Sequence, residues 1–168
     1  MQAPDTRQMI HFRLEDGRVF NHRAAGIALR NGDVLICRED DDPYTLLPGG
    51  RIEIGEDSRT SITREIAEEM KAPGQVGRLL FTAENFFERD GRQFHELGIY
   101  YEITPPASVP FVTGEPALVT EDEGHVLYFH WAAIAGDDFA RYNLVPLWLR
   151  TRLGTLPENP QHIMVDER

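Results

Sequence analysis

The sequence has little cysteine and no long hydrophobic run. Its one cysteine, Cys37, excludes both an intramolecular disulfide bond and a four-cysteine zinc site. Because Cys37 ends the apolar run at residues 34–37, we expect a buried core thiol there rather than a catalytic nucleophile. No hydrophobic run is long enough to cross a membrane, and the chain does not open with a charged-then-apolar leader. We therefore expect a cytoplasmic protein without a membrane partner.

Basic residues are also scarce relative to acidic ones. Lysine and arginine together number 17, against 28 aspartate and glutamate residues, so the net charge is −11 at pH 7. Such a surface does not attract nucleic acid, because binding to the phosphate backbone needs clustered Lys and Arg side chains. We therefore expect no nucleic-acid partner. A cluster of carboxylates is unfavourable unless a cation neutralises it. Whether the acidic residues indicate a cation site or only a soluble surface therefore depends on where they lie.

The rest of the pattern predicts one mixed α/β domain. A chain of 168 residues can bury a core, and we expect a single domain over residues 1–168 with a mostly irregular tail from about residue 155. Helices are expected at residues 58–71 and 143–153, among many strands, which predicts an α/β (α+β) sandwich around a mixed β-sheet. The expected strands lie at residues 9–14, 18–23, 24–30, 34–38, 44–47, 76–82, 96–103, 126–131 and 163–165.

The helix expected at residues 58–71 carries a group of acidic side chains. Glu65, Glu68 and Glu69 stand at positions i, i+3 and i+4, which places their carboxylates side by side on a helix. Like charges at this spacing destabilise a helix by about 0.2–0.5 kcal/mol per pair, so a compensating cation is expected. A hard divalent cation would serve, because Mg²⁺ and Mn²⁺ prefer carboxylate oxygen. The alternative is an ordinary acidic face in contact with solvent.

The segment ahead of this helix favours the metal site. Gly49 and Gly50 are expected to end the strand at residues 44–47 and to leave the backbone bare, so that a carbonyl oxygen can act as an additional metal ligand. Glu56 stands just before the helix, where a negative charge suits the helix dipole and can pair with Arg64. An isolated Gly-Gly pair would indicate only an ordinary turn. The metal-site interpretation therefore depends on the fixed spacing between this pair and the glutamates.

Together these residues resemble the Nudix box, which here spans residues 50–72. The box is a glycine, a glutamate six positions later, and an Arg-Glu pair followed by Glu-Glu at set spacing. The matching positions are Gly50, Glu56, Arg64, Glu65, Glu68 and Glu69. Lys71 stands where the pattern has its final glycine, whose expected role is to end the helix. We expect residues 72–74, Ala-Pro-Gly, to end it slightly later, without loss of the metal ligands.

The resemblance implies a Nudix-like α/β/α sandwich and a hydrolase that acts on phosphorus-containing acid anhydrides. Such a pyrophosphatase uses Mg²⁺ or Mn²⁺ to cleave a phosphoanhydride bond in a nucleoside diphosphate linked to another group, for example a nucleoside triphosphate or a nucleotide sugar. It implies that Glu65, Glu68 and Glu69 bind the metal, with the Gly50 carbonyl beside them. A homodimer is compatible with the resemblance, although no segment of the sequence indicates its interface.

The resemblance also assigns roles around the metal. Glu69 or Glu68 would accept a proton from water, Arg64 would orient Glu65, and Glu56 would hold Arg64. An acid from a later loop often completes such a site, and the candidates by position are Glu96, Glu115, Glu121 and Glu123.

Substrate-binding residues are less sharply indicated. Arg23 and Arg51 could contact phosphate, with a surface salt bridge as the alternative for each, and Glu96 could lie beside the site. Aromatic side chains could stack on a base, although core packing is expected for most of them; the candidates are Phe86, Phe87, Phe94, Tyr100 and Tyr101. The markers of ADP-ribose-cleaving and diadenosine-polyphosphate-cleaving members are both missing from residues 85–89, so the substrate stays open.

Two other functions compete with the hydrolase. The first is a catalytically weak Nudix-fold module that binds nucleotides or regulates; such modules usually lose the glutamates that this chain keeps. The second is an isoprenoid diphosphate isomerase of the same fold, which relies on a catalytic cysteine, and Cys37 in its apolar surroundings is a poor candidate for that role.

Overall fold

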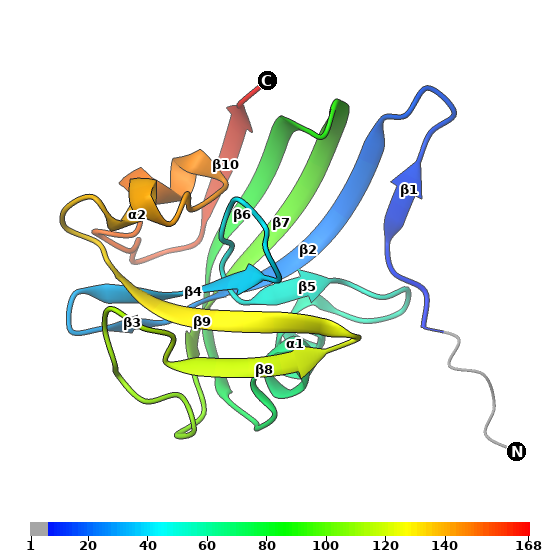
Figure 1. Ribbon diagram of the computed structural model, residues 1–168. Coiled ribbons are helices and arrows are strands. Elements are labelled where there is room, and N and C mark those ends of the chain that lie inside the picture. The colour runs from blue at the N-terminus through cyan, green and yellow to red at the C-terminus, as the bar shows by residue number, and fades with distance from the viewer. Residues whose placement is uncertain (1–6) are drawn as a thin grey trace, which may run out of the picture.

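The strands form two sheets in a computed structural model that describes residues 7–168 (Figure 1). The larger sheet has the order β1-β2-β7-β6-β10, with β5 paired to β2. Its strands are β1 (His11–Arg13), β2 (Val19–Ile27), β5 (Gly49–Arg51), β6 (Gln75–Arg89), β7 (Arg92–Thr104) and β10 (Gln161–Asp166). The smaller sheet has the order β3-β4-β9-β8 and consists of β3 (Leu29–Arg30), β4 (Asp33–Glu39), β8 (Leu118–Asp122) and β9 (His125–Ala133). Because β2–β7 and β6–β10 are parallel pairs among antiparallel ones, the larger sheet is mixed, as predicted.

The glycine pair lies in a strand instead of ending one. The strand expected at residues 44–47 is wrong, because that segment forms only isolated bridges, and the strand is β5, which pairs Gly49 and Gly50 with β2. Gly49 has a φ of 135°, and a Cβ there would lie 2.2 Å from the carbonyl oxygen of Ala24. Glycine is therefore required for β5 to approach β2. The strands expected at residues 18–23 and 24–30 are the continuous β2 and the short β3.

Helix α1 (Ser58–Met70) begins as predicted and ends one residue early. The Asp57 carboxylate caps it by accepting hydrogen bonds from the backbone N–H groups of Arg59 and Thr60. The expectation that residues 72–74 end the helix is wrong. Lys71 itself takes the left-handed conformation, with a φ of 57°, that a glycine usually supplies at this position.

The prediction of one continuous helix at residues 143–153 is wrong. The chain instead forms the short α2 (Asp138–Arg141) and a 3₁₀ helix, η1 (Leu147–Thr151). Pro146 lies inside the expected span, and a proline has no N–H to continue an α-helix. Within residues 7–168 no helix has the length and apolar character needed to span a membrane.

The polar segment at residues 88–92 is a tight hairpin turn rather than an open connection. Asp90 and Gly91 both have positive φ angles, 51° and 70°, which matches a two-residue turn between twisted strands. Strands β6 and β7 therefore extend much further than the expected 76–82 and 96–103, and pair up to Arg89 and Arg92. Strand β8 was not expected, whereas the final strand at residues 163–165 is confirmed within β10.

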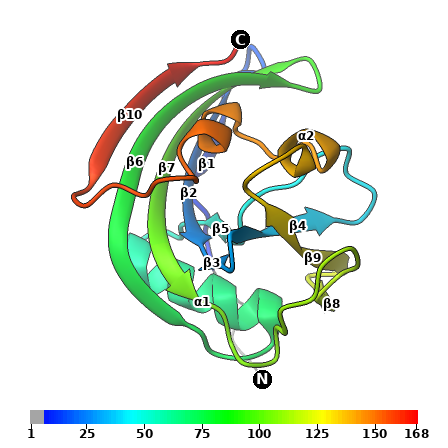
Figure 2. The same cartoon turned by 90° about the vertical axis from the view of Figure 1, so that its left-hand side faces the viewer.

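The smaller sheet lies between two helical layers (Figure 2). Leu35 of β4 packs in one hydrophobic cluster with Ile62 and Ile66 of α1. Ile36, its neighbour on the opposite face, packs in a second cluster with Trp148 of η1. Successive side chains of β4 thus pack into the two hydrophobic clusters in turn, as expected for a strand that is buried on both faces. The predicted α/β fold class is confirmed, with α2 and η1 in place of a longer second helix.

Candidate active site

Arg64 joins four acidic side chains at the first half of α1. Its guanidinium donates to both oxygens of Glu56, at 2.8 and 2.9 Å, which is a bidentate pair. The same group donates to Glu65 Oε1 at 2.7 Å and to Glu68 Oε2 at 3.0 Å, and its Nε lies 3.5 Å from Glu53 Oε1. These carboxylates raise the pKa of Arg64 above its usual value, Glu56 most of all. Arg64 therefore fixes the side chains of Glu65 and Glu68 in one orientation.

Glu69 is buried one turn beyond Glu65 along α1, and within residues 7–168 it forms no ion pair. Its Oε2 accepts a hydrogen bond from the backbone N–H of Gly49 at 3.1 Å. Burial, reinforced by the neighbouring Glu65 carboxylate, raises the pKa of Glu69 to about 8, although Arg23 and the Gly49 N–H oppose the shift. Burial also raises the pKa of Glu65, against the opposing effect of Arg64. Two neighbouring carboxylates are thus held where their ionised forms are disfavoured.

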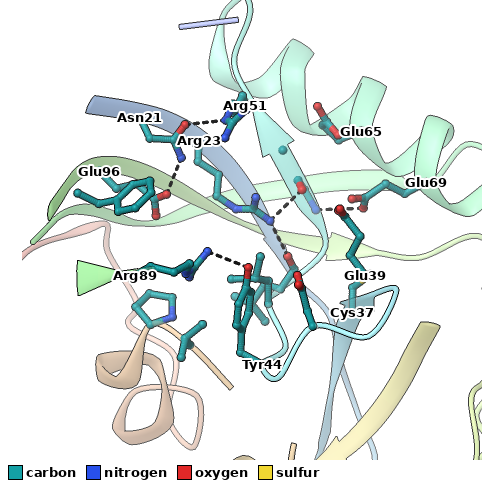
Figure 3. Close-up of a pocket in the computed structure, with 18 of the residues that line it drawn as sticks. Asn21, Arg23, Cys37, Glu39, Tyr44, Arg51, Glu65, Glu69, Arg89 and Glu96 are labelled. Carbon is teal, nitrogen blue, oxygen red and sulfur yellow. Dashed lines mark hydrogen bonds between the residues drawn. The ribbon is translucent and has the colours of Figure 1, made fainter. Parts of the chain in front are cut away.

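Gly50 lies against the carboxylate of Glu65. A Cβ built on Gly50 would fall 2.4 Å from the Glu65 carboxyl carbon, so any larger residue there would displace the Glu65 carboxylate. Figure 3 shows Glu65 and Glu69 reaching from α1 towards β5. The bare backbone that the sequence predicts at Gly50 is therefore beside the acidic group, within a strand instead of a loop.

A different acidic group is the most tightly clustered one in the described part of the chain. Glu39, Asp40 and His125 can each place a ligand atom within 4.8 Å of the others, and all three side chains are exposed. The His125 Nδ1 lies 2.7 Å from Asp40 Oδ2. Among residues 7–168, Glu65, Glu68 and Glu69 do not meet that distance criterion. The sequence did not single out this exposed group, whose members come from two segments far apart in the chain.

A cleft of about 990 Å³ runs from α1 across the face of the larger sheet. Most predicted site residues line it: Arg23, Gly50, Arg51, Arg64, Glu65, Glu68, Glu69, Glu96 and Glu123. Glu56 does not line the cleft, and its carboxylate accepts hydrogen bonds from Arg64 and from the Glu53 N–H. Glu115 and Glu121 do not line it either, whereas Asp122, between the candidates Glu121 and Glu123, does.

The two arginines that were expected near phosphate both face this cleft. Arg23 donates to the carbonyl oxygens of Leu47, at 3.0 Å, and Gly49, at 2.8 Å. Arg51 donates through Nε to Asn21 Oδ1 at 3.0 Å. Within residues 7–168 neither arginine makes an ion pair, so the surface-salt-bridge alternative is wrong for both. Burial, with the nearby Arg23 charge, lowers the pKa of Arg51.

The candidate aromatic residues divide into two groups. Tyr100 and Tyr101 are buried in the core. Phe87 and Phe94 line the cleft and stack on each other, with ring centroids 4.9 Å apart and an interplanar angle of 3°. Phe86 stacks on His95 outside this cleft, so three of the five candidates do not line it.

Several residues that line the cleft were not predicted from the sequence. Asn21 donates to Glu96 Oε2 at 2.7 Å, and Arg89 donates to the Tyr44 hydroxyl at 3.2 Å (Figure 3). Asn85 is 2% exposed, and neither polar atom of its side chain makes a hydrogen bond within the described residues. A polar residue at an inward position of a strand would have been a signal for Asn85, but the expected strand ended at residue 82.

A family model identifies the family, and solved structures share the fold. A family model for the NUDIX domain matches residues 20–144, and no curated protein matches the sequence significantly. The fold resembles that of a mutator MutT protein from Bacillus halodurans, at 12% identity and a TM-score of 0.57, over 87% of this chain and 89% of that one. It also resembles an ADP-ribose pyrophosphatase from Streptococcus suis, at 11% identity and a TM-score of 0.52, over 86% of this chain and 98% of that one. A NUDIX hydrolase from Nitrosomonas europaea covers 99% of both chains at 12% identity and a TM-score of 0.52. At these identities the three structures establish the fold alone, and the match over residues 20–144 shows that the chain belongs to the Nudix family.

Proposed function

We propose that this chain is a metal-dependent pyrophosphohydrolase that cleaves a phosphoanhydride bond in a nucleoside diphosphate linked to another group. The observation that carries the proposal is the buried Glu69 carboxylate beside Glu65, in a cleft that also presents Arg23 and Arg51. A lone acidic face would lie in solvent, where burial would not raise the pKa of its carboxylates. The burial of these carboxylates therefore favours a site that binds a cation.

The donors at this position fit a hard divalent cation, and Nudix hydrolases use divalent metals. Burial raises the pKa values of Glu65 and Glu69 although Arg64 and Arg23 oppose the shift, so a cation bound there would favour both ionised forms. Glu65, Glu68 and Glu69, with the Gly50 carbonyl, would hold Mg²⁺ or Mn²⁺, since both prefer oxygen ligands. Bound there, the cation supplies Lewis-acid chemistry that neutralises phosphate charge and polarises the phosphorus centre.

The chain's own residues supply positioning, charge and a proton acceptor. Arg64, held by the bidentate Glu56 pair, positions the Glu65 and Glu68 side chains. Glu69 or Glu68 accepts a proton from the attacking water as the water oxygen bonds to phosphorus. The bond between phosphorus and the bridging anhydride oxygen breaks, and the leaving phosphate group departs with its electron pair. The positive charges of Arg23 and Arg51, which also line the cleft, balance the charge that develops on the phosphate oxygens.

The isomerase alternative receives no support from the thiol. Cys37 is 8% exposed, and burial and the Glu69 charge raise its pKa well above the usual value. A thiolate is the reactive form of cysteine, and this environment disfavours it.

A substrate panel with matched variants tests the proposal. The full chain would be incubated with nucleoside triphosphates, ADP-ribose and nucleotide sugars, with Mg²⁺, with Mn²⁺ and with a chelator, and the phosphate and nucleotide products measured. Glu69→Gln and Glu65→Gln should each lower metal-dependent turnover by about 10² or more. Glu121→Gln removes the same charge from an exposed residue outside the cleft and should leave turnover unchanged.

Two results would contradict the proposal. Turnover that persists in the chelator, or that survives both active-site substitutions, would show that the acidic group is not the catalytic one. Nucleotide binding by calorimetry without hydrolysis under any divalent metal would instead favour a binding or regulatory module.

A further inference from the structure

Asn85 is the cleft residue with the least explained environment. It is 2% exposed, and neither its amide nitrogen nor its amide oxygen has a hydrogen-bond partner within the described residues. A buried polar group without a hydrogen-bond partner destabilises the fold, and Asn85 has two such groups within the described residues. Asn85 lines the cleft, so a bound molecule is the partner that could satisfy both atoms.

Asn85 continues a row of polar groups across three strands, which we call the polar row: Asn21, Glu96 and Asn85. In the strand register Asn21 of β2 stands beside Glu96 of β7, which stands beside Asn85 of β6. Asn21 Nδ2 donates to Glu96 Oε2 at 2.7 Å, and Asn21 Oδ1 accepts from Arg51. Glu96 is itself only 8% exposed. A carboxylate can accept several hydrogen bonds, so Glu96 can accept others besides the one from Asn21. The row thus offers a ligand a carboxylate acceptor beside an amide that both donates and accepts.

Flat side chains border the polar row towards the tip of the β6–β7 hairpin, and we call them the aromatic row: Phe94, Phe87, Arg89 and Tyr44. Phe87 and Phe94 are the next inward pair after Asn85 and Glu96, and their rings are parallel. The Arg89 guanidinium lies 5.2 Å from the Phe87 ring centroid and 4.1 Å from that of Tyr44. Aromatic rings and guanidinium planes are the surfaces on which nucleobases stack.

The polar row and the catalytic glutamates lie at opposite ends of the cleft, with the arginines between them (Figure 3). In register, Arg23 stands beside Gly98, two residues along β7 from Glu96 on the side away from Phe94. Arg23 then bonds the carbonyl oxygen of Gly49, whose N–H bonds Glu69. The order of surfaces is therefore aromatic, polar, cationic and acidic, which is the order of base, phosphates and metal in a nucleotide complex.

Resting on the proposed function, we propose that the polar row and the aromatic row form a base-binding site selective for guanine. Glu96 can only accept, and guanine presents two adjacent donors, its ring N–H and its exocyclic amine. The Asn85 amide then donates to the neighbouring guanine carbonyl. Uracil would set carbonyl oxygens against the Glu96 carboxylate, and adenine and cytosine each place one donor beside an unprotonated ring nitrogen. A site built around such hydrogen bonds rejects bases that leave its buried polar groups unpaired.

Binding of nucleoside monophosphates without metal tests the base site apart from hydrolysis. Calorimetric titrations of the full chain with GMP, AMP, CMP and UMP in a chelator should show GMP binding at least about ten-fold tighter than the other three. Glu96→Gln and Asn85→Leu should each weaken GMP binding by about ten-fold or more and change UMP binding much less. Glu102→Gln removes the same charge from β7 outside the cleft and should leave every affinity unchanged.

Asn85→Leu also separates a binding role from a structural one. Leucine has nearly the shape of asparagine and removes two unpaired polar atoms, so the variant should melt a few degrees higher than the wild type while binding GMP more weakly. A lower melting temperature would assign Asn85 to structure and overturn its role in binding. If Asn85→Leu does not fold, Glu96→Gln carries the test alone.

The base site and the hydrolase fail in distinguishable ways. Equal affinities for the four monophosphates, or no binding at millimolar concentration, would overturn the guanine site whether or not the enzyme hydrolyses nucleotides. A GMP preference in a chain that hydrolyses nothing with any metal would uphold the base site and refute the proposed function.

Discussion

Replacing Glu69 with glutamine is expected to stabilise the metal-free protein at alkaline pH and to abolish hydrolysis. Burial and the Glu65 charge raise the pKa of Glu69 from 4.5 to about 8, so the ionised carboxylate is disfavoured in the fold. Between pH 4.5 and about 8 the folded protein keeps a proton that the unfolded chain has lost, and stability therefore falls as pH rises through this window. Glutamine does not titrate, so its contribution stays constant.

The magnitude follows from the width of that window. An interval from 4.5 to about 8, at about 1.4 kcal/mol per pH unit, sets an upper bound of about 5 kcal/mol above pH 8. Glutamine can still accept the hydrogen bond from the Gly49 N–H, which is 3.1 Å long in the wild type. Local relaxation around the ionised carboxylate reduces the bound, so we expect the variant to be more stable by about 2–3 kcal/mol at pH 9.

Urea denaturation in a chelator between pH 5 and pH 9 measures this difference. The gap between the variant and the wild type should widen up to about pH 8 and then level off, whereas Glu121→Gln should show no gap at any pH. Adding Mg²⁺ should stabilise the wild type and not the variant, because a ligand stabilises only the folded state that binds it. A gap that does not change with pH, or a wild type more stable than the variant at pH 9, would refute the reasoning.

Three further substitutions probe the surroundings of Glu69. Gly50→Ala should lower metal-dependent kcat by about ten-fold or more while the protein stays folded, because the new Cβ would meet the Glu65 carboxylate at 2.4 Å; wild-type kinetics would contradict the close packing. Arg64→Lys should lower kcat/KM by about 10² and unfolding free energy by about 1–3 kcal/mol, since lysine cannot make the bidentate pair; kinetics and denaturation measure both, and an unchanged kcat/KM would show that Arg64 does not position the glutamates. Lys71→Gly should raise the unfolding free energy by up to about 1 kcal/mol with unchanged activity, because Lys71 has a φ of 57°; a less stable variant would show that its ion pair outweighs the backbone strain.

The sequence was most informative where the site is local. Glu65, Glu68 and Glu69 share one helix and were grouped with Gly50 and Arg64 by their spacing, and all five line one cleft. Helix periodicity places such residues side by side without knowledge of the rest of the fold. The start of α1 was predicted for the same reason, because its cap, Asp57, is a neighbour in the chain.

The errors arise where distant segments decide the outcome. The left-handed Lys71 and the glycines in β5 depend on what packs against them, which a local pattern does not contain. Tyr44 meets Arg89 from 45 positions away, and Asn21 meets Glu96 from 75 positions away. Arg89 lies at the end of β6, beyond the strand expected at residues 76–82. The contact between Asn21 and Glu96 depends on the pairing of β2 with β7, which the expected strand ranges do not specify. The sequence therefore did not indicate Asn21, Asn85 or Arg89, whose place in the cleft depends on the strand register.

The cleft also explains how a chain of net charge −11 can receive an anionic substrate. Arg23 is held by the carbonyl oxygens of Leu47 and Gly49, which are neutral, and Arg51 is held by the amide of Asn21. Had carboxylates held these arginines, their positive charge would be neutralised before a phosphate arrived. Carboxylates instead gather on α1, where Arg64 orders them and where a divalent cation can reverse their sign. For the proposed function, the separation of the two charges along one cleft therefore matters more than the net charge.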